Sequence, residues 1–173
     1  MLLALDTWEN LLEGLENEEV VLENERELKY YFFHRCLILM KKRKFDKPYS
    51  IFAEDSLNAR EKYPKKCDLV LGKVVAIEFK HKKSINTNEV NEVKDDILKL
   101  ESYIKEQKTW AGVFLMIDHT GHYEQRITPF IRSKVPSNSF EWQTKKLPNK
   151  KEKVHTLKVV LLPRALKVSL SRR

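Results

Sequence analysis

Two neighbouring stretches of this chain combine apolar, β-branched residues with isolated charged side chains. The apolar runs cover residues 69–71 and 74–79, and Asp68, Glu78 and Lys80 lie within or beside them. Such runs are typical of strands that are covered on both faces. A charged group there loses favourable hydration unless it is paired or binds a metal. Two carboxylates beside a lysine could hold a divalent cation next to a group that stabilises negative charge.

The loop between the two strands decides whether these carboxylates lie together. Gly72 begins a hairpin signal, and directly opposed residues of an antiparallel pair share a face. A two-residue loop would place Asp68 opposite Ile77, on the other face from Glu78. A three-residue loop, 72–74, would place Asp68 opposite Glu78. We therefore expect the longer loop or a bulge, with Gly72 at positive φ; carboxylates on opposite faces would argue against a shared metal site.

The chemistry that fits this arrangement is phosphodiester hydrolysis. Mg²⁺ takes oxygen ligands and is the expected ion, held by Asp68 and Glu78, and Mn²⁺ is expected to substitute for it. Lys80 follows Glu78 by two residues and so shares its face of the strand. There it would orient the attacking water or stabilise the developing negative charge.

The order Asp68, nine residues, Glu78, one residue, Lys80 resembles the D…(D/E)xK motif of the PD-(D/E)XK nuclease superfamily. Cys67 stands where this family often has Pro. The resemblance implies an α/β fold with a restriction endonuclease-like core, in which a helix, a three-strand meander, a crossover helix and a further strand form a mixed central sheet flanked by helices. It also implies a metal-dependent DNA endonuclease.

The rest of the chain follows this order of elements. We expect helices over residues 19–41 and 88–105, and strands over residues 49–54 and 110–117. A helix between two strands predicts a crossover connection, so the last strand should run parallel to the strand of Glu78.

Three regions are expected within one domain. Residues 1–19 would form an amphipathic helical extension beginning near Asp6, residues 20–118 the nuclease core, and residues 119–173 a basic C-terminal extension of the same domain. A late edge strand is expected near residues 157–162. Residues 118–122 are interpreted as a turn.

A third carboxylate is expected from the first long helix. The segment Glu25-Arg26-Glu27-Leu28 resembles the Glu-Arg-x-Leu/Ile segment of archaeal Holliday-junction resolvases, a branch of the same superfamily. There the first Glu reaches the metal site, which implies a catalytic and metal-binding role for Glu25 and favours junction or branched DNA as substrate. Glu27 is the alternative, Glu54 is a third candidate, and a solvated acidic first turn would explain either helix residue without a site.

Basic residues are concentrated at the end of the chain. The net charge is +8, and residues 141–173 carry ten Lys and Arg against two Asp and Glu, so this segment holds the whole excess. Such a segment suits contact with a phosphate backbone, although ordinary solubilising charge is the alternative. The residues expected to contact DNA are Lys42, Arg43, Lys82, Lys83, Lys145, Lys146, Lys150 and Lys151.

Partners and compartment follow from simpler features. Cys36 and Cys67 lie in apolar segments and are expected to be reduced core residues. No apolar run is long enough to cross a membrane and the first residues do not resemble a signal peptide, so we expect no membrane partner and a cytoplasmic protein of a prokaryote or virus. A homodimer would let two sites cut two strands.

Two other functions stay open. A catalytically inactive protein could keep the nuclease fold as a DNA-binding or assembly module. A basic RNA-binding domain unrelated to nucleases is the third hypothesis, and it would leave the buried charges unexplained.

Overall fold

The computed structural model describes residues 1–17, 19–43, 51–56, 66–72, 74–84, 86–147 and 153–163. The described helices are α1 (Leu2–Glu16), α2 (Glu25–Lys42), α3 (Thr87–Lys105), α4 (Tyr123–Lys134) and a short 3₁₀ helix at Ser137–Ser139. The described strands are β1 (Ile51–Ser56), β2 (Lys66–Leu71), β3 (Val75–Lys82), β4 (Ala111–Asp118), β5 (Phe140–Lys146) and β6 (Lys153–Leu161).

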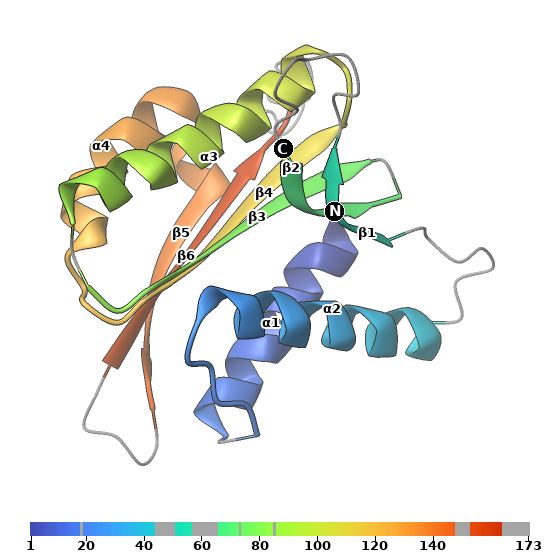
Figure 1. Cartoon of the computed structure of the whole chain (residues 1–173), viewed down its shortest axis with the longest axis vertical. Coiled ribbons are helices and arrows are strands. Elements are labelled where there is room, and N and C mark those ends of the chain that lie inside the picture. The colour runs from blue at the N-terminus through green and yellow to red at the C-terminus, as the bar shows by residue number, and fades with distance from the viewer. Residues whose placement is uncertain are drawn as a thin grey trace.

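These elements form an α/β fold around one mixed sheet with the strand order β1-β2-β3-β4-β6-β5. Neighbouring strands are antiparallel except for β3 and β4, which are parallel. Helices α1 and α2 cover one face and α3 and α4 the other (Figure 1). The expected meander of β1 to β3, and the crossover through α3 to a parallel strand, are confirmed.

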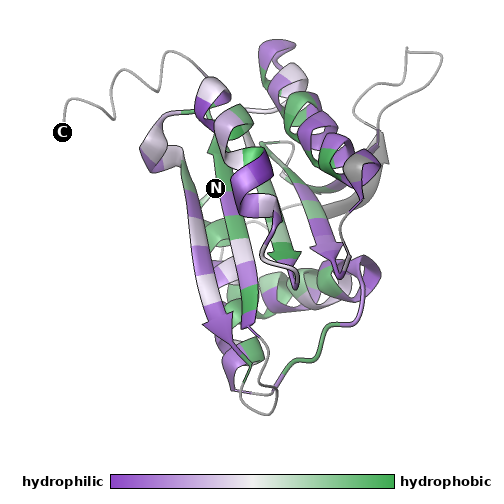
Figure 2. Ribbon diagram, turned by 90° about the vertical axis from the view of Figure 1, so that its left-hand side faces the viewer, coloured by the Kyte–Doolittle hydropathy of each residue, from purple (hydrophilic) through white to green (hydrophobic). Residues whose placement is uncertain are grey.

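Each face of the sheet has its own apolar core. On the α1/α2 face the rings of Phe32 and Phe79 pack edge to face, with centroids 4.9 Å apart. On the other face Ile97 of α3 and Phe114 of β4 are fully buried. Figure 2 shows hydrophobic residues along the strands and on the sides of the helices that face them. Burying each such side chain contributes about 1.5–3 kcal/mol, which holds both helix layers against the sheet.

The loop between β2 and β3 is the three-residue loop that the sequence predicts. Leu71 pairs with Val75 and Leu69 with Ile77. Gly72 has a φ of 60°, a left-handed conformation that favours glycine. Because this loop sets the register, Asp68 on β2 lies opposite Glu78 on β3.

Both N-terminal helices begin elsewhere than expected. Helix α1 begins at Leu2, so Asp6 lies inside the helix, where its carboxylate is 2.7 Å from the guanidinium of Arg43. Helix α2 begins only at Glu25, because the side chain of Asn24 accepts a hydrogen bond from the backbone N–H of Glu27 and caps the helix.

The C-terminal third completes the same sheet. Strand β6 lies between β4 and β5, so its expected position at the edge is wrong, and β5 is the edge strand instead. Helix α4 was not expected, although Tyr123, Ile127 and Ile131 form its buried stripe at helical spacing. None of the described helices is both long enough and apolar enough to cross a membrane.

Candidate active site

The candidate site lies where β2 and β3 separate. The paired residues end at Leu69 and Ile77, although both strands continue beyond them. Beyond this point side chains of β2 form hydrogen bonds with backbone groups of β3. Asp68 Oδ2 accepts a hydrogen bond of 2.9 Å from the N–H of Phe79, and the thiol of Cys67 donates one of 3.2 Å to the carbonyl of Ile77. The carboxylate of Asp68 therefore lies in the gap between the two strands.

Asp68 and Glu78 make their ion pairs with different helix layers. Asp68 Oδ1 is 2.7 Å from the ammonium of Lys29 on α2, and Glu78 Oε1 is 2.8 Å from that of Lys99 on α3. The register was predicted correctly. The shared face was not, because the N–H of Phe79 holds the Asp68 carboxylate between the strands, and this separation counts against a metal ion shared by Asp68 and Glu78. The two carboxylates are still close enough for the charge of Asp68 to raise the pKa of Glu78.

Further ion pairs join these two carboxylates into one chain of alternating charges. Glu25 lies 3.1 Å from the ammonium of Lys29 and 3.8 Å from that of Lys80. Asp96 lies 2.9 Å from the ammonium of Lys80 and 3.1 Å from that of Lys99. In order, this ion-pair chain consists of Asp68, Lys29, Glu25, Lys80, Asp96, Lys99 and Glu78.

The two ends of the ion-pair chain, Asp68 and Glu78, are both carboxylates, and the charge of Asp68 acts on the pKa of Glu78. Its side chain is only 2% exposed. Burial and then the charge of Asp68 raise the pKa of Glu78 to about 8, although Lys99 opposes the shift. A cation placed between Asp68 and Glu78 would offset the repulsion between the two carboxylates and favour the ionised form of both.

Lys80 connects the two helix layers at the centre of the ion-pair chain. Burial lowers its pKa, but hydrogen bonding and charge attraction from Asp96, followed by the charges of Glu25 and Asp68, more than offset this, so the pKa of Lys80 lies above its ordinary value. Lys80 is therefore a permanent cation at neutral pH, suited to stabilising negative charge and unsuited to acting as a base.

The donor set fits a hard divalent ion that is held by few protein ligands. Within the described ranges, no three His, Cys, Asp or Glu side chains are grouped as a metal site. Mg²⁺, however, is often held by two carboxylates with water and substrate phosphate. Glu78 Oε1 and Asp96 Oδ2 are buried and, apart from their ion pairs with lysines, accept no well-directed hydrogen bond from described residues. Asp68 and Glu78 would be the ligands of such an ion.

The two candidate glutamates of α2 have different surroundings. Glu27 accepts hydrogen bonds from the N–H of Glu23 and the side chain of Asn24, so its carboxylate completes the helix cap. Glu25 instead contacts Lys29 and Lys80 of the ion-pair chain. The side chain of Glu54, the third candidate, lies outside the described residues.

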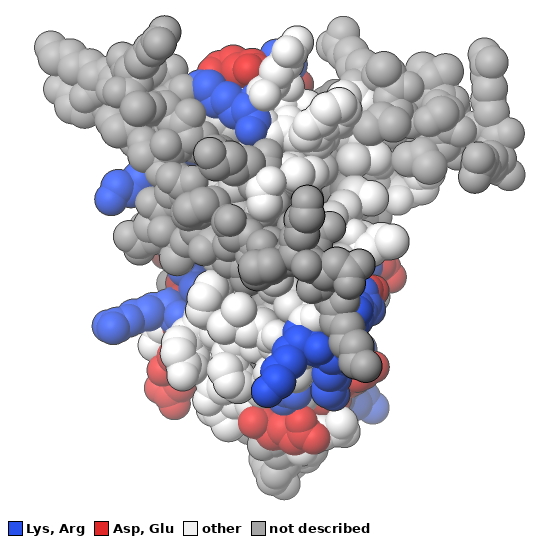
Figure 3. Space-filling model, turned by 90° about the vertical axis from the view of Figure 1, so that its right-hand side faces the viewer, with Lys and Arg blue, Asp and Glu red and all other residues white. Residues whose placement is uncertain are grey.

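The basic residues expected to contact DNA are divided between both ends of the sheet. Arg43 lies beside Leu71 and Val75 at the hairpin end of β2 and β3, away from Lys80. Lys82 and Lys145 lie at the same end as Lys80, but Lys82 pairs with acidic residues of α3 and Lys145 with one of α1. The exposed members of the described set are Lys42, Arg43, Lys83 and Lys146, whereas Lys150 and Lys151 lie outside the described residues. On the face drawn in Figure 3, described basic and acidic side chains are interspersed among neutral ones.

Two histidines, one near the end of β3 and one directly after β4, lie beside the candidate site but outside the ion-pair chain. His81 Nε2 is 3.1 Å from His119 Nε2. Burial, then the neighbouring His119 and Lys83, lower the pKa of His81 to about 4, so it is neutral at pH 7. The buried carboxylate of Asp118 accepts hydrogen bonds from Thr120 and from the N–H of Tyr123, which explains the turn before α4 structurally.

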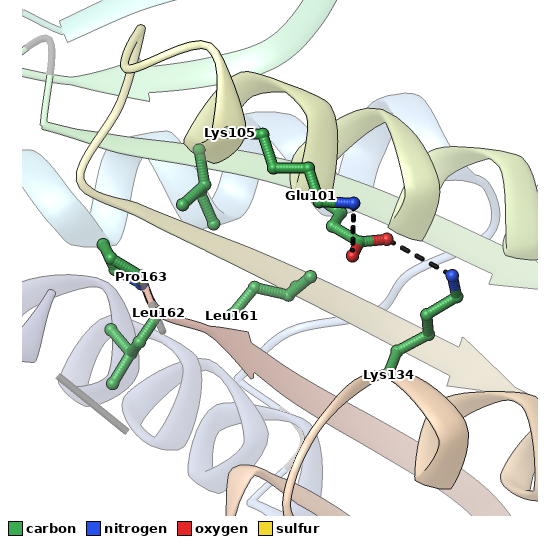
Figure 4. Close-up of a pocket in the computed structure, with 7 residues that line it drawn as sticks. Glu101, Lys105, Lys134, Leu161, Leu162 and Pro163 are labelled. Carbon is green, nitrogen blue, oxygen red and sulfur yellow. Dashed lines mark ion pairs between the residues drawn. The ribbon is translucent and has the colours of Figure 1, made fainter. Parts of the chain in front are cut away.

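A surface pocket between α3, α4 and the end of β6 is separate from the candidate site. Glu101 lies within it and pairs with Lys105 and Lys134 (Figure 4). Leu161 and Pro163 line its apolar side. None of its lining residues belongs to the ion-pair chain.

Three members of the ion-pair chain, Lys29, Asp96 and Lys99, were not among the predicted site residues. Their signal in the sequence is weak but present. Lys29 follows Glu25 by four residues, and Lys99 follows Asp96 by three, so each helix carries an acid–lysine pair one turn apart. Such pairs are common on solvated helix faces, and only the packing of both helices against the sheet brings them to Asp68 and Glu78.

Comparisons of the chain with protein-family models, with curated proteins and with solved structures gave no match.

Proposed function

We propose that this chain is a metal-dependent DNA endonuclease with a restriction endonuclease-like core. The observation that carries the proposal is the gap between β2 and β3, where Asp68 and Glu78 end a chain of alternating charges and Lys80 lies at its centre. Two carboxylates at the ends of this chain, with the half-buried Lys80 at its centre, suit a phosphodiester held by a cation.

Each residue of the proposed site has a separate role. Asp68 and Glu78 would hold Mg²⁺ or Mn²⁺, which when bound polarises the phosphate and lowers the pKa of water. Lys80, fixed by Asp96 and permanently charged, stabilises the negative charge that develops on the phosphate. Asp96 and Lys99 position Lys80 and Glu78 from α3.

The substrate class rests on the likeness of Glu25-Arg26-Glu27-Leu28 to junction resolvases, which favours junction or branched DNA. A homodimer would supply two sites for two strands. Of the residues predicted to contact DNA, exposed Lys83 and Lys146 lie at the same end of the sheet as Lys80.

The test is one labelled panel of supercoiled plasmid, linear duplex, single strand, flap and four-way junction, incubated with Mg²⁺, Mn²⁺ or EDTA. We expect cutting that requires the metal, with the junction or flap cut fastest. Cutting in EDTA, or no cutting of any panel member with either metal, would contradict the proposal.

A specific observation favours a second function, a catalytically inactive DNA-binding or assembly module. Lys29 and Lys99 already pair with Asp68 and Glu78, so lysines supply part of the positive charge that a metal would bring. Salt-sensitive binding of the panel without cutting would support this function.

Because Glu25 and Glu27 have different surroundings on α2, we expect their replacement to have different effects. Glu25→Gln removes a charge from the ion-pair chain and is expected to slow cleavage about 10-fold or more, as for residues that orient a metal site. Glu27→Gln weakens the cap of α2 and should lower the free energy of unfolding by up to about 1 kcal/mol while leaving cleavage within a few-fold of wild type. Rates and urea unfolding of both variants, measured together, check this. Equal loss of cleavage in both would contradict the assignment.

A further inference from the structure

Lys29 occupies a position between two carboxylates that a cation could otherwise fill. Its ammonium lies 2.7 Å from Asp68 Oδ1 and 3.1 Å from Glu25 Oε1. Helix geometry fixes one of these contacts, because Glu25 and Lys29 are one turn apart, and the packing of α2 against the sheet at β3 brings Lys29 to Asp68 for the other. An ammonium group that contacts two carboxylate oxygens makes two charge-assisted hydrogen bonds and supplies one of the two positive charges that a divalent ion would bring.

The two strand carboxylates differ in how their lysines are held. Lys99 contacts Glu78 and Asp96, donates a hydrogen bond to the carbonyl of Lys66, and is 15% exposed. Lys29 contacts only the two carboxylates among described residues and is 30% exposed. Lys99 is thus held by three partners, whereas Lys29 has two and is twice as exposed to solvent.

We propose that Lys29 takes the place of a second divalent ion between Glu25 and Asp68, so that the site holds a single ion, bound by Asp68 and Glu78. This inference rests on the proposed function. In this inference Glu25 pairs with Lys29 and Lys80 and does not bind a metal, which differs from the role that the resemblance implies. It also predicts that removing one side chain, without adding any ligand, creates a second metal position.

The test is Mn²⁺ stoichiometry without DNA, measured by calorimetry and by electron paramagnetic resonance. Wild type is expected to bind one ion per chain. Lys29→Met, which keeps an unbranched side chain with good helix propensity, is expected to bind two. Lys29→Arg should keep one. Lys105→Met removes the lysine of another acid–lysine pair one turn apart, Glu101 and Lys105, and should also keep one.

The outcomes separate the two proposals. Two ions on wild type, or one ion on both wild type and Lys29→Met with equal affinity, would overturn the inference and leave the proposed function standing. No ion on either protein would overturn the metal-dependent function and the inference with it. Circular dichroism and thermal unfolding of each variant confirm that the stoichiometries refer to folded protein.

Discussion

Glu78→Gln is expected to abolish metal-dependent cleavage and, at alkaline pH, to make the fold more stable. Cleavage is lost because a neutral amide replaces a ligand of the proposed ion, which is worth several kcal/mol of transition-state stabilisation, or about 10²–10³-fold in rate. Stability rises because the 2% exposed carboxylate no longer has to ionise in a buried position.

The sign of the stability change follows from the pKa of Glu78, which is about 8 in the fold against 4.5 for an ordinary Glu. Below pH 4.5 the Glu78 carboxyl group is protonated in both the folded and the unfolded chain, so it does not lower the free energy of unfolding. Between pH 4.5 and 8 the unfolded chain loses the proton first, so the stability of wild type falls as pH rises, by at most about 1.4 kcal/mol per pH unit. Gln does not titrate.

Urea unfolding at pH 5 and pH 9 measures this difference. The stability of Glu78→Gln relative to wild type should increase by about 2 kcal/mol or more between the two pH values. Glu9→Gln, at a 42% exposed carboxylate paired with Lys158, is the control and should shift by less than about 1 kcal/mol. A relative stability of Glu78→Gln that does not change with pH would contradict the burial argument.

Lys80→Met is expected to slow cleavage by about 10²–10³-fold, the usual cost of removing one group that stabilises transition-state charge. The fold should persist because Asp96 keeps its ion pair with Lys99. Mn²⁺ binding should be retained or tightened, since a positive charge leaves the neighbourhood of Asp68 and Glu78. Single-turnover cleavage and Mn²⁺ titration of the same preparation measure both effects.

Lys82→Met is the matched control for Lys80→Met. Lys82 lies two residues further along β3, on the same side of the strand, and pairs with Glu89 and Glu92 of α3 outside the ion-pair chain. Its replacement should change the single-turnover rate by no more than a few-fold. Equal losses for Lys80→Met and Lys82→Met would mean that general positive charge matters and not the position of Lys80.

The register of the central hairpin could be predicted from the sequence because two local signals agree. Gly72 supplies the left-handed turn residue, and only the three-residue loop aligns Asp68 with Glu78. The parallel strand β4 could be predicted because α3 lies between it and β3 and carries a clear apolar stripe. Both predictions depend on patterns within short segments.

Helix α4 and strand β5 were missed because their local patterns are weak. Pro129 interrupts the helical pattern of α4 and cannot donate a helical hydrogen bond, and the burial of Ile127 and Ile131 against the core offsets the free-energy cost. The residues of β5 are all exposed or half-buried, so its apolar alternation is incomplete. Pairing with β6 determines its conformation.

The residues of the candidate site that lie on strands could be predicted from the sequence, whereas most of those on helices could not. Asp68, Glu78 and Lys80 stand out because charge within apolar strands is unusual. Lys29 and Lys99 do not stand out, because lysines one turn from an acidic residue are ordinary on helices. Their role depends on α2 and α3 packing on opposite faces of the sheet, which brings one lysine to Asp68 and the other to Glu78. Spacing along the chain does not reveal this.

The most direct test of the proposed nuclease centre is single-turnover cleavage of the best panel substrate by wild type and Asp68→Asn, purified in parallel and assayed with Mg²⁺ and with EDTA. Asp68→Asn keeps the shape of the side chain and an oxygen that can accept the N–H of Phe79. We expect wild type to cut only with Mg²⁺, and Asp68→Asn to lose at least about 10²-fold in rate. Equal cutting by both proteins, or none by wild type, would contradict a metal-dependent nuclease centred on Asp68 and Glu78.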